Sequence, residues 1–121
     1  MSSLFEAIAL HVYNDSEFQK PIRHYALNRL QEEPPLDKDE DEDEARSFRA
    51  CVAAMRQEGV WISELAKPLF GAIAELLDIQ LTITQYRQDE SDGRIHRTTY
   101  GEQGTPIHLV RVQENLFCVK V

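Results

Sequence analysis

Cysteine is scarce in this chain, which has only two among its 121 residues. Cys51 and Cys118 lie far apart in the sequence, and neither belongs to a Cys-x-x-Cys pair or to a Cys/His ligand spacing. This pattern argues against a disulfide framework and against a structural zinc site. We expect two buried thiols in a reducing compartment, and therefore a cytoplasmic protein, or one delivered into a host cytosol if it is an effector.

Patterns typical of membrane proteins and of cofactor sites are also missing. No apolar run approaches the roughly 20 residues that a membrane span requires, and no glycine-rich phosphate loop follows a predicted strand. The four histidines fit no zinc motif, and none lies beside a cysteine in a local catalytic signature; they are His11, His24, His96 and His108. We therefore expect no membrane contact, no metal and no cofactor. The residues alone reveal no active site.

The chain has few positively charged residues: it contains 13 Lys and Arg residues against 21 Asp and Glu residues, and its formal net charge is -8. Such a charge repels nucleic acids and anionic membranes, so a protein partner with a basic face fits better. Seven acids, interrupted only by Lys38, occupy positions 37 to 44. We expect a flexible acidic loop at 34–45, since like charges repel each other and stay solvated. The alternative is that the acids of this segment bind a basic partner.

The hydrophobic pattern predicts helices first and strands last. Apolar residues recur at helical spacing and then, beyond Asp78, at every second residue. The predicted helices cover 4–13, 16–33, 45–58 and 63–77, the last with its start near Lys67, and the predicted strands cover 79–86, 94–100, 107–112 and 116–121. The first two strands should form a hairpin with its tip at 88–93. We expect one α+β domain over residues 1–121, with a small mixed or antiparallel sheet flanked by helices. Because the first predicted helix begins almost at Met1, a domain truncated at its N-terminus remains one of the expectations.

Three stretches of the chain, which begin at Ser3, Met55 and Pro106, carry motifs that resemble those of the ovarian tumour (OTU) family of deubiquitinating cysteine proteases. The first, Ser3-Leu4-Phe5-Glu6-Ala7-Ile8-Ala9, is similar to the family's opening motif, in which a Cys at the N-terminus of a core helix is the nucleophile. The second is similar to the family's middle block of Met, Gly-x-Trp and Glu-Leu, and includes Met55, Gly59-Val60-Trp61 and Glu64-Leu65. The third, from Pro106 to Val110 and from Asn115 to Val119, resembles the family's last two strands. The resemblance implies an OTU-like fold over nearly the whole chain.

The catalytic positions depart from the family pattern. Carried over one at a time, Ser3 stands at the nucleophile, Leu116 at the base, and Cys118 at the residue that orients the base. A leucine neither accepts nor donates a proton, so Ser3 has no base at the family position. His108 on the neighbouring strand is the candidate substitute base.

Two hypotheses follow from these departures. The first is a catalytically inactive OTU-like domain, that is, a pseudo-deubiquitinase that binds a protein partner. The family resemblance implies that this partner is ubiquitin or a ubiquitin-like protein. The second is a deubiquitinating cysteine protease whose nucleophile is replaced by Ser3 in this chain. The sequence does not specify an oligomeric state.

Overall fold

The computed structural model describes residues 3–32, 42–57, 59–86, 95–113 and 115–119. Within these residues four α-helices precede four strands, as the hydrophobic pattern predicted. The helices are α1 (Leu4–Tyr13), α2 (Gln19–Glu32), α3 (Glu42–Met55) and α4 (Ala66–Leu77), with short 3-10 helices η1 (Ser16–Phe18) before α2 and η2 (Ser63–Leu65) before α4. The strands are β1 (Ile79–Tyr86), β2 (Ile95–Tyr100), β3 (Thr105–Gln113) and β4 (Leu116–Val119).

The ends of the first helices follow from local chemistry. Asn14 adopts a left-handed conformation at the end of α1, and its N–H donates to the carbonyl oxygen of Leu10. The Asp15 carboxylate then accepts a hydrogen bond of 3.0 Å from the N–H of Glu17, which caps η1. Pro21 is the third residue of α2, a position where its missing N–H costs no helical hydrogen bond. The predicted break between the two helices is confirmed.

The predicted extent of the acidic loop is wrong at its C-terminal end. Glu42, Asp43 and Glu44 form the first turn of α3, so the helix begins three residues before the predicted 45. Carboxylates in a first turn lie next to the unpaired N–H groups of the helix and its positive dipole end, which favours the helix over a solvated coil. The rest of the predicted loop, 34–41, lies outside the described residues.

The described strands form one mixed sheet in the order β2-β1-β3-β4. β1 pairs antiparallel with β2, which confirms the predicted hairpin, although its tip lies outside the described residues. β1 pairs parallel with β3, and β3 pairs antiparallel with β4. The parallel pair requires a crossover, and β2 with its following loop supplies it.

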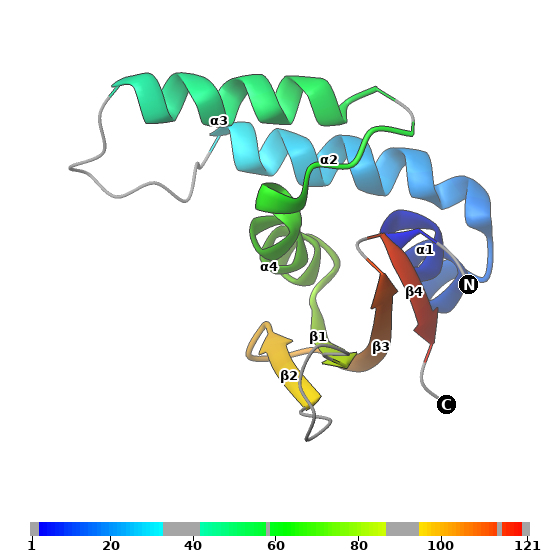
Figure 1. Cartoon of the computed structure of the whole chain (residues 1–121). Coiled ribbons are helices and arrows are strands. Elements are labelled where there is room, and N and C mark those ends of the chain that lie inside the picture. The colour runs from blue at the N-terminus through cyan, green and yellow to red at the C-terminus, as the bar shows by residue number, and fades with distance from the viewer. Residues whose placement is uncertain (1–2, 33–41, 58, 87–94, 114, 120–121) are drawn as a thin grey trace.

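The core lies between one face of this sheet and the helices. The strand residues that face the helices are buried: Leu81, Ile83, Ile107, Leu109 and Phe117. α4 contacts β1 and α2, α3 lies along the outer side of α2, and α1 lies next to β4 (Figure 1). The opposite face of the sheet carries polar side chains together with apolar ones such as Val110 and Leu116, and these are half-buried or exposed, apart from the buried Thr84. No helix among the described residues is long and apolar enough to cross a membrane.

Candidate functional site

The start of α1 and the start of β4 meet in the folded chain. The backbone N–H of Leu4 donates a hydrogen bond of 3.0 Å to Oδ1 of Asn115, although 111 positions separate the two residues in the sequence. Leu4 is the first residue of α1, and Asn115 directly precedes β4. The hydrogen bond therefore brings Ser3 and Leu116, the two positions that stand for nucleophile and base in the family pattern, to the same region of the molecule.

Ser3 is the N-cap residue of α1 but does not cap it with its side chain. Its backbone is extended, with φ -62° and ψ 166°, and its carbonyl oxygen accepts the N–H of Ala7 at 2.8 Å. The Ser3 hydroxyl makes no capping hydrogen bond, and the residue is half-buried. The amide of Asn115 thus performs part of the role that a serine N-cap usually performs.

Leu116 and Cys118 share one face of β4, because side chains alternate along a strand. Phe117 points the other way, into the core, where its ring lies edge-on to Phe70 with centroids 6.0 Å apart. Leu116 and Cys118 are both half-buried. An aliphatic group and a thiol therefore stand at the two strand positions that the sequence resemblance assigns to a base and its orienting residue.

The two cysteines are free thiols, as the sequence pattern predicted. Each is half-buried rather than buried, which corrects the expected burial of Cys51 and Cys118. Among the described residues, no group of three or more His, Cys, Asp or Glu side chains is arranged to hold a metal ion.

His108, the candidate substitute base, is held within the sheet. Its Nε2 atom lies within hydrogen-bond distance of the Thr84 hydroxyl, and the Nε atom of Arg97 donates to the same hydroxyl at 3.3 Å. Thr84 belongs to β1, which lies on the side of β3 away from β4. The hydrogen bond of His108 therefore points away from the strand that carries Leu116.

Asn115 is the site residue that the sequence analysis did not single out. Its position gives one usable signal, since it is a polar amide between two strands and directly precedes Leu116, the position that the sequence resemblance assigns to the base. The sequence pattern predicts a turn there but not the partner of the amide, because the contact is made across the whole length of the chain.

Comparison with solved structures shows an OTU-like fold. The chain matches the OTUD1 OTU domain with a TM-score of 0.65 and 19% identity, covering 98% of this chain and 80% of that one. It matches the viral OTU domain protease of Dera Ghazi Khan virus with a TM-score of 0.67 and 12% identity, over 97% and 74% of the two chains. It matches the viral OTU domain protease of Farallon virus with a TM-score of 0.66 and 14% identity, over 98% of this chain and 77% of that one. No family model and no curated protein matches the chain.

Proposed function

We propose that this chain is a non-catalytic OTU-like domain that binds a protein partner, of the ubiquitin type, without cleaving it. The observation that supports this most strongly is the chemistry at the junction of α1 and β4. The two segments that would supply nucleophile and base are joined by the hydrogen bond from Leu4 to Asn115, and they carry Ser3 and Leu116. The scaffold of the fold is thus retained with side chains that do not form an acid–base pair.

Proton transfer is the first step that this arrangement lacks. A serine hydroxyl is a weak nucleophile and requires a general base within hydrogen-bond distance. The side chain of Leu116 has no lone pair to accept the proton, and the thiol of Cys118 two positions on does not replace an orienting carboxylate or amide. His108 makes its hydrogen bond to Thr84 instead.

Anion stabilisation is also reduced. A thiolate at a helix N-terminus is favoured by the unpaired N–H groups of the first turn. The N–H of Leu4 is already engaged by the Asn115 amide at 3.0 Å, so one of these donors is not available to a developing negative charge near Ser3. This contact stabilises the fold at the expense of a reactive centre.

Ubiquitin-type partners are favoured by the family resemblance and by charge. A net charge of -8 promotes encounter with a basic protein surface and opposes encounter with nucleic acid. The acidic first turn of α3 contributes to this field, with Glu42, Asp43 and Glu44 all exposed.

The catalytic half of the proposal is tested with a ubiquitin-derived electrophile that traps reactive thiols. Three proteins are compared: the natural chain, Ser3→Cys, and the double variant Ser3→Cys/Leu116→His. The natural chain reports the background from Cys51 and Cys118. We expect no adduct above this background for the first two and an adduct for the double variant, because only the latter restores a thiol together with a base. Rapid labelling of Ser3→Cys alone would show that a base is already present and would refute the non-catalytic assignment.

The binding half is tested separately by NMR titration of the natural chain with mono-ubiquitin and with a ubiquitin chain. We expect saturable shifts confined to one surface. The absence of shifts at high ubiquitin concentration would remove ubiquitin as the partner, while leaving the result of the electrophile experiment unaffected.

The alternative function is a deubiquitinating cysteine protease in which Ser3 has replaced the nucleophile. It requires His108 to act as base from β3. Adding His108→Ala to Ser3→Cys distinguishes the two: a reactive Ser3→Cys protein that loses its reactivity on this addition would support the alternative. Under our proposal His108→Ala changes nothing, because there is no reactivity to lose.

A further inference from the structure

Three large apolar side chains remain exposed where α1 ends and η1 leads into α2. Leu10, Tyr13 and Phe18 are 39%, 43% and 41% exposed. Leu10 and Tyr13 are three positions apart in α1, so they lie on the same side of this helix. The rings of Tyr13 and Phe18 stack, with centroids 4.4 Å apart and an interplanar angle of 19°. The three side chains thus form one continuous surface, which we call the α1–η1 patch.

The fold leaves the α1–η1 patch exposed while it buries the apolar residues beside it. Ile8 and Ala9 of α1 are fully buried, and Ile22 of α2 is buried as well. A single exposed apolar side chain is common on a protein surface, but a contiguous group bordered by polar residues marks an interaction site. The stack also holds both rings in one arrangement, so a partner that covers them immobilises few additional torsions. The patch is therefore suited to bind another molecule.

The charges that border this patch along the chain are all negative. The first 19 residues contain Glu6, Asp15 and Glu17 and no Lys or Arg. Asp15 and Glu17 are exposed, and the backbone N–H of Glu17 donates a hydrogen bond of 3.0 Å to the Asp15 carboxylate, which orders the turn between the two rings. Glu6 lies one helical turn before Leu10 on the same side of α1. A partner with a basic surface therefore complements this region in charge.

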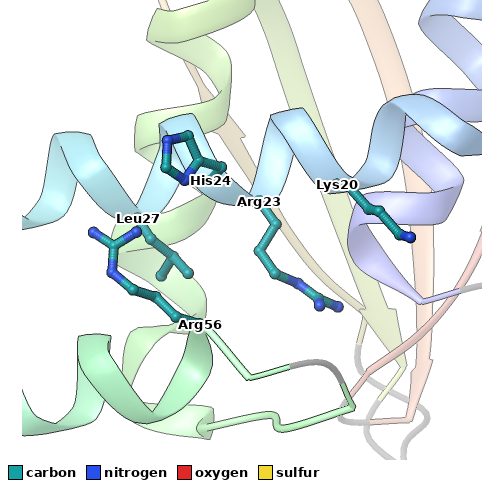
Figure 2. A pocket seen from close by; sticks show the side chains of 5 residues that line it. All are labelled: Lys20, Arg23, His24, Leu27 and Arg56. Carbon is teal, nitrogen blue, oxygen red and sulfur yellow. The ribbon is translucent and has the colours of Figure 1, made fainter.

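The first Lys and Arg residues of the chain point to another side of the molecule. Lys20 and Arg23 of α2 line a cavity between α2 and the end of α3, together with Arg56. Figure 2 shows Arg23 pointing from α2 toward the segment that follows α3, and Lys20 leaving the helix on the same side. Among the described residues, no ion pair joins any of these cations to Asp15 or Glu17. The two carboxylates therefore keep their charge for an external partner.

We propose that the α1–η1 patch is the docking surface for a protein partner that presents an apolar patch ringed by Lys and Arg. The inference rests on the proposed function for the existence of such a partner. Large aromatic side chains contribute most at the centre of an interface, while charges at its rim favour encounter with the complementary surface. A second copy of this chain is a poorer match, because it brings the same acids and a net charge of -8 to the contact.

The patch is separate from the junction of α1 and β4. Ser3 precedes the first residue of α1 and Tyr13 is its last, so about 15 Å of helix lies between them. Docking on the patch therefore requires nothing of the side chains at Ser3 and Leu116, and it is compatible with a domain that binds its partner without cleaving it.

The proposal is tested by NMR titration of the whole chain with mono-ubiquitin as the probe. We expect saturable shifts at residues 10–18. Tyr13→Ala and Phe18→Ala should each weaken binding about tenfold, because each removes an aromatic side chain from the centre of the interface. Asp15→Asn should weaken binding about two- to fivefold at low salt and less at high salt, since it removes a rim charge but keeps a residue that can cap η1.

The matched control is Ile95→Ala, which shortens an apolar side chain that is 53% exposed on β2. β2 lies at the opposite edge of the sheet from β4, the strand that contacts α1. The affinity of this variant should equal that of the natural chain, and far-UV circular dichroism of every variant verifies that it is folded.

The outcomes separate this inference from the proposed function. Saturable shifts on another surface, with unchanged binding by Phe18→Ala, would overturn the docking surface and leave the proposed function standing. No binding at all would remove ubiquitin as the partner and this docking surface with it. A dimer of the natural chain in sedimentation velocity that Phe18→Ala abolishes would assign the patch to self-association and would also overturn the proposal.

Discussion

Replacing Asn115 by Ala removes the acceptor that joins the turn before β4 to the first turn of α1. Leu4 is fully buried, so its N–H has little access to water once the Asn115 amide is gone. A buried donor left without a partner costs about 1–3 kcal/mol. For a domain of this length we expect the melting temperature to fall by roughly 3 to 10 °C. Ser3→Ala should change the stability by less than about 0.5 kcal/mol, because the serine hydroxyl makes no capping hydrogen bond.

The two variants are compared with Asn115→Asp by urea unfolding followed with far-UV circular dichroism. Aspartate keeps the acceptor oxygen and places a negative charge at the helix N-terminus, so its stability should equal or exceed that of the natural chain. Two results would refute the reasoning. One is an Asn115→Ala protein as stable as the natural chain, and the other is a Ser3→Ala protein less stable than Asn115→Ala, which would identify the serine as the true cap.

Three further predictions concern the core, a turn and the response to alkaline pH. Phe117→Ala should cost about 3–5 kcal/mol of the free energy of unfolding, whereas Phe18→Ala should cost well under half of that; the two side chains are 1% and 41% exposed, and urea unfolding of both variants measures the difference. Gly104→Ala should prevent folding or lower the melting temperature by far more than Gly59→Ala. Both glycines have positive φ, but a Cβ atom at 104 would lie 2.0 Å from a backbone carbonyl oxygen and one at 59 would meet nothing within 4 Å; equal losses would contradict this. Burial raises the pKa of Tyr100 above the ordinary value, so the folded chain holds the phenolic proton to a higher pH than the unfolded chain. The contribution to stability is then fully present below about pH 10 and is lost as pH rises through the pKa of the folded state, and Tyr100→Phe should show a shallower decline of melting temperature over that range.

Much of the fold was predictable from local patterns. The change from helical to alternating spacing at Asp78 marks the boundary between α4 and β1, and the break at Asn14 and Asp15 marks the end of α1. These features depend on which residues are apolar and on backbone preferences within a few positions. The start of α3 was mispredicted because the acids from Glu42 to Glu44 were interpreted through their mutual repulsion. Their position at a helix N-terminus outweighs it.

The candidate site was predictable only in its chemistry. The family resemblance named Ser3, Leu116 and Cys118, and the side chains at these positions supply no base whatever their geometry. The hydrogen bond of Asn115 and the engagement of His108 with Thr84 could not be predicted, because each depends on the packing of elements distant in the chain.

The sequence by itself determined an acidic α+β domain and the identity of the side chains at Ser3 and Leu116, since composition and short-range periodicity are local properties. Only the tertiary structure decided that the two segments meet and that Lys20, Arg23 and Arg56 surround one cavity. The physical reason is that side chains far apart in the sequence come together through the burial of other residues. Phe5 illustrates this, because it is buried in the core while its ring supports the guanidinium of Arg23.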